Sequence, residues 1–367
     1  MRPPTPTSPI PLVSPAGHPD AWHDVRSPGG YEWWYFDAED AATDTQLVAI
    51  LLDGFVFHPG YLRRHFRYLR RPTRHPPATA RDYPCAYFIL YESGRVTAQF
   101  MTQYPPGSLQ ASRDGPDVRL GPNRFHLDGD DLVLSLAGTP WSLTPRGPVT
   151  HRDQRLTVSW RLTPVTRHPA HERPFLSRAM TGADHHWVLA APHCRFTATV
   201  RLAAPRGDRL WQLAGRGYHD HNYGTGPLGP GLHRWIWGRA LFDDACYTFH
   251  YAVPRDARLP PEPHVLRITP DAGVADVSPA PDAVRGRFDR HSALALAYPA
   301  SLDLSVMRLA EPRVVDNTPF YLRLTYTAEC EGRRGTAFCE VAYPHRLRWP
   351  VLGRMIEMSF DQRPSVV

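Results

Sequence analysis

The residues best suited to acid–base chemistry lie close together in segment 216–224, which reads Arg-Gly-Tyr-His-Asp-His-Asn-Tyr-Gly. Alternate side chains of a β-strand share one face. If this segment is a strand, Tyr218, Asp220 and Asn222 point one way, and the two intervening histidines point the other. A carboxyl group beside a phenol in apolar surroundings can protonate an otherwise unreactive carbon–carbon double bond. We therefore interpret Asp220 as a candidate acid.

A second predicted strand adds a histidine and a tryptophan to this group. His185 and Trp187 alternate along the chain and would meet Tyr218 and Asp220 if the two strands are neighbours. To stay protonated at neutral pH, Asp220 needs its pKa raised by burial from a reference near 3.9 to about 7, which costs roughly 4 kcal/mol. Alternatively, these aromatic residues simply fill a barrel core. An unpaired acid inside a core is costly, and this favours the functional interpretation.

Two further segments, 31–35 and 235–239, alternate aromatic residues. Such faces suit a long apolar ligand and can stabilise a passing carbocation by cation–π attraction, although a plain aromatic core is the alternative. Arg239 fits a plain core poorly, because it would need a buried partner such as Glu32. The candidate substrate-binding residues are Trp33, Tyr35, Asn222, Trp235, Trp237 and Arg239.

Other kinds of catalysis find less support. His219 and His221 have the spacing of two zinc ligands on a strand, but no third ligand has a diagnostic spacing, so no metal is expected. There is no Gly-x-Ser-x-Gly motif, and none of the five cysteines lies in a catalytic motif. All 42 basic residues are arginine, which excludes a Schiff-base lysine and a phosphate-loop lysine. We expect no cofactor.

The elements that must position these groups are short strands. Forty prolines and 26 glycines favour many strands joined by turns, and we expect no long amphipathic helix. We predict an all-β fold of barrels or sandwiches, with a flexible arm at 1–25 and domains at 26–180 and 181–367, divided at a composition break over 164–183. Strands are predicted from apolar runs or alternation at 47–56, 87–91, 96–101, 132–136, 156–162 and 196–202.

Charge and cysteine usage indicate the surroundings of the chain. The net charge is +6, and the arginine-rich segment 62–75 is predicted to be a solvated loop or a contact with an anionic membrane surface. No nucleic-acid-binding fold accompanies it. The dispersed, odd number of cysteines favours reduced thiols. With no signal peptide and no apolar run of about 20 residues, we expect a cytoplasmic protein, soluble or peripheral at the inner membrane.

A series of ordered segments resembles the carotenoid 1,2-hydratases, also called hydroxyneurosporene synthases, of the lipocalin-like superfamily. The resemblance implies two consecutive lipocalin-like antiparallel β-barrel domains. It also implies cofactor-independent addition of water to the terminal C1=C2 bond of an acyclic carotenoid or related isoprenoid. The matching segments are 29–38, 56–61, 185–187, 217–222, 227–228, 235–239 and 316–321.

The resemblance also implies roles for single residues. Protonated Asp220 would deliver a proton, Trp187 would stabilise the resulting cation, and His185 and Tyr218 would position or deprotonate the attacking water. The hydratase pattern Tyr-Leu-Asp-Ser-Asn-Arg-Gly is replaced here by Tyr-His-Asp-His-Asn-Tyr-Gly. This version is similar to other branches, which include phytoalexin hydratases and Diels–Alder cyclases. The alternatives are therefore a cyclase or pericyclase of polyketides or terpenoids, and a non-catalytic carrier of an apolar ligand.

Overall fold

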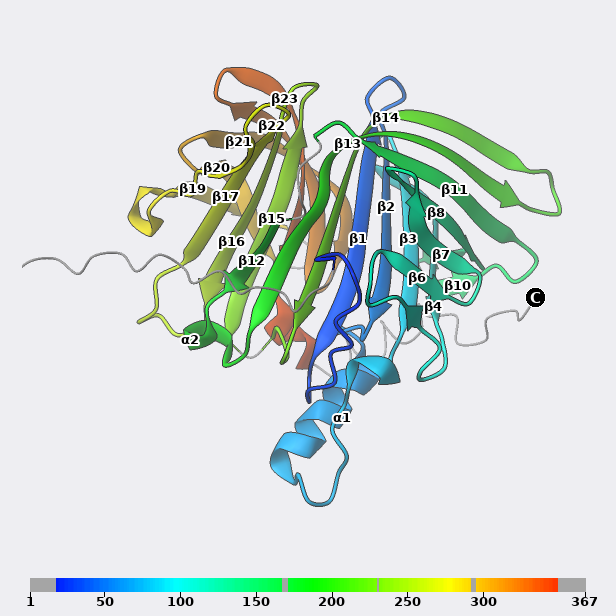
Figure 1. Cartoon of the computed structure of the whole chain (residues 1–367), viewed down its shortest axis with the longest axis horizontal. Coiled ribbons are helices and arrows are strands. Elements are labelled where there is room, and N and C mark those ends of the chain that lie inside the picture. The colour runs from blue at the N-terminus through cyan, green and yellow to red at the C-terminus, as the bar shows by residue number, and fades with distance from the viewer. Residues whose placement is uncertain (1–17, 167–170, 230, 292–294, 349–367) are drawn as a thin grey trace, which may run out of the picture.

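The protein consists of two curled antiparallel sheets that stand side by side (Figure 1). The computed structural model describes residues 18–166, 171–229, 231–291 and 295–348. All six segments predicted as strands lie largely or wholly within strands, and each sheet curls into a half-barrel, so the predicted all-β, lipocalin-like fold is confirmed.

The first sheet contains twelve strands of the described chain. Its order is β4-β3-β2-β1-β14-β13-β11-β8-β7-β6-β5, with β12 paired to β13. The strands are β1 (Tyr31–Asp40), β2 (Thr45–Asp53), β3 (Cys85–Glu92), β4 (Arg95–Gln103), β5 (Gln110–Ala111), β6 (Asp117–Leu120), β7 (Asn123–Asp128), β8 (Asp131–Gly138), β11 (Arg155–Pro164), β12 (His171–Leu176), β13 (His185–Ala203) and β14 (Arg209–Gly224).

The second sheet has the order β18-β17-β16-β15-β23-β22-β21-β20-β19. Its strands are β15 (Leu232–Leu241), β16 (Cys246–Pro254), β17 (Glu262–Thr269), β18 (Gly273–Asp276), β19 (Arg285–Arg290), β20 (Ala297–Asp303), β21 (Met307–Thr318), β22 (Tyr321–Cys330) and β23 (Arg333–Ala342). The remaining elements are the hairpin β9 (Trp141–Thr144) and β10 (Gly147–Thr150), the helices α1 (Pro59–Arg70) and α2 (Arg178–Thr181), and the 3₁₀ turns η1 (Ala80–Asp82), η2 (Pro281–Ala283) and η3 (Pro344–Arg348).

Strand alternation assigns the side chains of β1 to two different cores. Trp34 and Phe36 pack inside the first half-barrel. Trp33 and Tyr35 point the other way, into a second core that lies between the two sheets. A third core fills the second half-barrel. Because β1 is buried on both faces, its aromatic residues are not the simple filling of one barrel.

Arg239 joins the two sheets. Its Nε donates to Asp37 Oδ1 at 2.8 Å, and its Nη1 donates to Glu39 Oε2 at 2.6 Å. The arginine is on β15 of the second sheet and both acids are on β1 of the first sheet, and all three are buried. The prediction that Glu32 is the partner of Arg239 was wrong, because Glu32 lies on the opposite face of β1 from Asp37 and Glu39.

Two other expectations are revised. Segment 62–75 is a loop only after residue 70, because α1 occupies residues 59–70. His58 caps the helix, Pro59 takes its first position, and Tyr61 and His65 are buried one turn apart. Residues 18–25, the described part of the expected arm, pack against the first sheet with Asp20 only 1% exposed. Along the chain, the first sheet ends with β14 and the second begins with β15, and β13 and β14 pair with each other within the first sheet. The domain boundary near residue 180 stays a prediction.

All five cysteines are buried free thiols, in agreement with the expectation of reduced thiols. Within the described ranges, no helix has both the length and the apolar character that a membrane span requires.

Candidate active site

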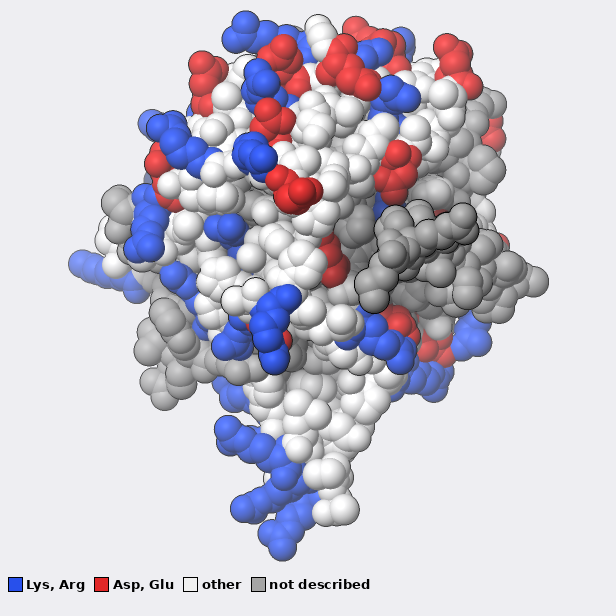
Figure 2. Space-filling model, turned by 90° about the vertical axis from the view of Figure 1, so that its left-hand side faces the viewer, with Lys and Arg blue, Asp and Glu red and all other residues white. Residues whose placement is uncertain are grey.

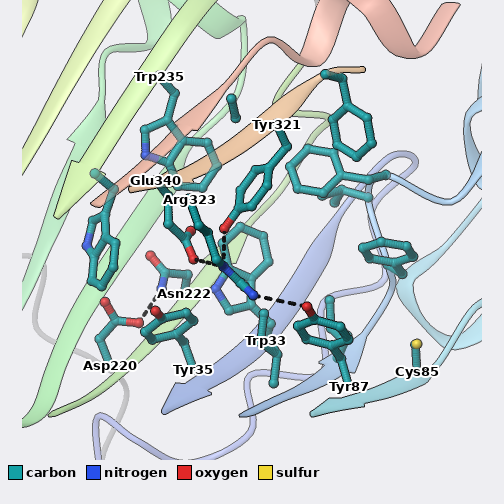
Figure 3. Close-up of a pocket in the computed structure, with 18 of the residues that line it drawn as sticks. Trp33, Tyr35, Cys85, Tyr87, Asp220, Asn222, Trp235, Tyr321, Arg323 and Glu340 are labelled. Atoms are coloured by element: carbon teal, nitrogen blue, oxygen red, sulfur yellow. Dashed lines mark hydrogen bonds and ion pairs between the residues drawn. The ribbon is translucent and has the colours of Figure 1, made fainter. Parts of the chain in front are cut away.

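A cavity of about 160 Å³ lies between the two sheets (Figure 3). Most of the residues around it are aromatic or aliphatic, and they come from both sheets. The cavity is therefore formed jointly by the two half-barrels. Seven of the residues selected from the sequence line this cavity: Trp33, Tyr35, Trp187, Asp220, Asn222, Trp235 and Trp237.

Asp220 is the buried acid of the cavity, with only 2% of its surface exposed. Its Oδ2 accepts hydrogen bonds from the Tyr218 hydroxyl and from Trp187 Nε1, both at 2.8 Å. Its Oδ1 accepts from Asn222 Nδ2, also at 2.8 Å (Figure 3). No cation of the described chain forms an ion pair with it.

Two opposing effects set the protonation of Asp220. Burial raises its pKa from 3.8 to about 7, although the hydrogen bonds from Tyr218 and Trp187 favour the charged form and lower it. The protonated and the charged form are therefore both populated near pH 7. An acid of this kind can donate its proton at neutral pH and is then left as a carboxylate that already has three donors.

The opposite face of β14 carries a network of buried histidines and acids. His219 Nε2 lies 3.0 Å from Asp20 Oδ2, and His221 Nε2 lies 2.9 Å from Glu32 Oε1. Burial alone would lower the pKa of His221, but the hydrogen bonds with Asp20 and Glu32 raise it to about 9. His219, His221 and Tyr223, where this segment departs from the hydratase pattern, are not among the residues that line the cavity.

One group in this network has the composition of a metal site. The ligand atoms of His23, Glu32 and His221 lie within 4.8 Å of one another. However, Glu32 Oε1 is already hydrogen bonded to both imidazoles, at 3.0 Å and 2.9 Å. The raised pKa of His221 means that a proton competes with a metal ion for the lone pair of this imidazole.

Three selected residues do not line the cavity. Tyr218 is fully buried and donates a hydrogen bond to Asp220, which does line the cavity. His185 bonds through Nδ1 to the Tyr31 hydroxyl at 2.9 Å, and burial lowers its pKa to about 4. Arg239 is held by its two acids on β1, so the structure gives it the position of a link between sheets.

Sequence reasoning missed a polar group in the cavity wall that is centred on Arg323. This side chain, 2% exposed, donates from Nε to the Tyr321 hydroxyl at 2.8 Å and from Nη1 to the Tyr87 hydroxyl at 3.0 Å, and it pairs with Glu340 at 3.1 Å (Figure 3). Alternation of Tyr321 and Arg323 is a detectable signal. Their pairing with Glu340 depends on the register of β22 and β23, which the sequence does not reveal.

Fold and site together define a lipocalin-like β-protein with an aromatic cavity and a buried acid between its two half-barrels. A solved structure of a putative AttH protein from Nitrosomonas europaea shares this fold, with a TM-score of 0.55 and 13% identity over 94% of this chain and 99% of that one. The family model described as "Carotenoid hydratase CrtC" matches residues 52–366. The chain belongs to this family.

Curated relatives agree with that assignment. The chain is 32% identical over 317 residues to a protein named hydroxyneurosporene dehydrogenase from Chlorobaculum tepidum, covering 83% of this chain and 79% of the relative. It is 26% identical over 343 residues to an acyclic carotenoid 1,2-hydratase from Thiocapsa roseopersicina, covering 91% and 73%. A further acyclic carotenoid 1,2-hydratase, from Rubrivivax gelatinosus, is 27% identical over 62% of this chain and 48% of that protein.

Proposed function

We propose that this protein adds water to the terminal C1=C2 double bond of an acyclic carotenoid or related isoprenoid, by acid catalysis and without a cofactor. The observation that carries the proposal is the buried carboxyl group of Asp220, whose pKa of about 7 and position in an aromatic cavity suit proton donation to an alkene. Membership of the carotenoid hydratase family supports the reaction and the substrate class.

The first step is protonation of the alkene. The O–H bond of Asp220 breaks, the π electrons of C1=C2 form the new C2–H bond, and a tertiary cation remains at C1. The Tyr218 hydroxyl and Trp187 Nε1 already point at Oδ2, so they stabilise the carboxylate as it forms without any reorganisation. The surrounding aromatic faces, including Trp33 and Trp237, stabilise the cation. Water then adds at C1 and loses a proton, which gives a tertiary alcohol.

The size of the cavity indicates which part of the substrate enters. An apolar cavity of roughly 150 Å³ binds a molecule the size of benzene. The volume of about 160 Å³ therefore suits the terminal isoprene unit, which contains the reacting bond. In this arrangement the rest of the polyene stays outside the cavity.

We further propose that α1 brings the protein to an anionic membrane surface, where such a polyene is dissolved. Figure 2 shows basic side chains gathered on the projection formed by α1, and segment 59–75 contains no acidic residue. Phe55, Val56 and Phe57 line the cavity and immediately precede this helix. Docking through α1 would place lipid next to the cavity wall. The exposed arginines are Arg63, Arg67, Arg70, Arg71 and Arg74.

The test is incubation of the purified protein with lycopene or neurosporene, followed by mass spectrometry of the recovered pigment. Hydration adds the mass of one water, and the added oxygen becomes ¹⁸O in labelled water. Recovery of unchanged pigment would indicate a carrier, and a product of unchanged mass would indicate a cyclase. Either result overturns the proposal.

A further inference from the structure

His250 on β16 is a second polar group in the cavity wall, and it is not part of the mechanism above. It is 2% exposed and lines the same cavity as Asp220. Among the described residues, neither of its ring nitrogens has a hydrogen-bond partner. Buried polar atoms nearly always have a partner, and leaving one without costs free energy. An imidazole in this position therefore indicates that the occupied cavity supplies the partner.

His250 and the acid reach the cavity from different sheets. Its ring packs against Phe175 at 5.0 Å and Trp235 at 5.4 Å between ring centroids. Its cross-strand neighbour is Trp237, which packs at 5.5 Å on Tyr218, the residue that donates to Asp220. His250 thus faces the cavity from the second sheet and Asp220 faces it from the first, so a double bond held between the two sheets can contact both groups.

The ring of His250 is neutral at neutral pH. Burial holds its pKa well below the usual 6.5. The nearby His264, Arg173 and His185 lower this pKa further, because positive charge on them repels a second ring proton. A neutral imidazole offers one acceptor nitrogen and one donor N–H. It can therefore hold a water molecule by its proton and accept that proton when the oxygen reacts.

We propose that His250 holds the attacking water and accepts its proton, a role that rests on the hydration reaction proposed above. After Asp220 has protonated C2, a lone pair of the water oxygen forms the C1–O bond. The O–H bond facing His250 then breaks and its proton moves to the free ring nitrogen. Transfer of a proton from the imidazolium back to the Asp220 carboxylate, through solvent, restores both groups, so the net change is alkene plus water to alcohol.

Two residues that the family resemblance links to the water are less well placed for this step. His185 is not among the residues that line the cavity, and its Nδ1 is bonded to Tyr31. The Tyr218 hydroxyl donates to Asp220 and is fully buried. His250 is the histidine that both lines the cavity and has unpartnered ring nitrogens in the described chain.

The experiment separates protonation from water capture by running the reaction in D₂O. The cation made by Asp220 has two fates: water captures it, or it loses hydrogen from C2 and returns to an alkene that carries deuterium there. His250→Phe, which cannot hold or deprotonate water, is expected to hydrate about a hundredfold more slowly. It should still incorporate deuterium at C2 of the recovered substrate. His250→Gln, which can hold water but is a poor base, should fall between the wild type and His250→Phe.

His193→Gln is the matched control. His193 is a buried histidine whose ring nitrogens are bonded to the Thr166 hydroxyl and to the Phe242 carbonyl oxygen, both at 2.9 Å, and it is not among the residues that line the cavity. This variant should show the wild-type ratio of deuterium exchange to hydration. The ratio does not depend on how much protein is folded, and thermal unfolding of each variant confirms that the folded state is present.

Each other outcome has a definite meaning. Wild-type hydration by His250→Phe and His250→Gln would overturn the role of His250 and leave the proposed function intact. Parallel loss of hydration and exchange in both folded variants would also overturn it, because His250 would then act before the cation forms. If the wild-type protein neither hydrates nor exchanges, the proposed function itself fails.

Discussion

Replacing Asp220 by asparagine tests the acid, because it removes the titrating proton and keeps the size of the side chain. We expect hydration to be abolished while the protein stays folded. The structure also predicts how stability changes with pH. The pKa of Asp220 is about 7 in the folded protein and 3.8 in the unfolded chain. The folded state therefore keeps a proton that the unfolded state releases, and stability is lost as pH rises from about 4 through 7.

The magnitude follows from those two values. Relative to a side chain that does not titrate, the wild type loses about 2 kcal/mol by pH 5 and about 4 kcal/mol by pH 8, since each pH unit of difference is worth about 1.4 kcal/mol. Asp220→Asn should therefore gain about 2 to 3 kcal/mol on the wild type between pH 5 and pH 8. Any constant cost of the altered hydrogen bonds cancels in this difference. Urea unfolding at the two pH values measures it.

Asp53 offers a control for the same measurement. It is buried, accepts from Trp22 Nε1 at 3.1 Å, and has a pKa raised to about 7, chiefly by burial. It is not among the residues that line the cavity. Asp53→Asn should show a similar pH trend in stability and retain hydration. The reasoning is refuted if Asp220→Asn retains activity, or if its stability relative to the wild type does not change between the two pH values.

Three further predictions address the neighbouring groups. Trp187→Phe removes a donor that favours charged Asp220, so the pH above which hydration declines should move upward from about 7 in a pH–rate profile; an unmoved profile contradicts this. Arg239→Leu leaves Asp37 and Glu39 without their cation and should cost about 3 to 5 kcal/mol in urea unfolding, whereas a loss under about 1 kcal/mol would show that the link is dispensable. Exchange of the five exposed arginines of segment 62–75, three in α1 and two just after it, for glutamine should weaken binding to anionic vesicles by about 1 kcal/mol per residue in sedimentation, with hydration in detergent unchanged. Equal binding to anionic and zwitterionic vesicles contradicts membrane docking through charge.

Alternation along single strands predicted much of the site. It placed Tyr218, Asp220 and Asn222 on one face of β14 and separated them from His219 and His221, as the structure confirms. This works because the period of two is a property of the strand itself. It needs no knowledge of what lies across the sheet.

What the sequence did not predict depends on long-range register. Sequence reasoning paired Arg239 with the wrong acid. Which face of β1 lies against β15 is set by the packing of the two sheets, and neither strand alone reveals it. His250 and Arg323 were missed for the same reason, since both join the cavity from strands that carry no other acid–base motif. Helix α1 was taken for a loop, since only Tyr61 and His65 mark its buried side among many arginines.

The two imidazoles behind β14 have a consequence for the orientation of the acid on its front. A strand that slips by one residue exchanges its two faces. Such a slip would carry the Asp220 carboxylate towards Asp20 and Glu32, where like charges repel. It would also turn His219 and His221 towards the apolar cavity. The network thus helps to fix the register of β14, and changes to residues outside the cavity can alter the face on which Asp220 lies.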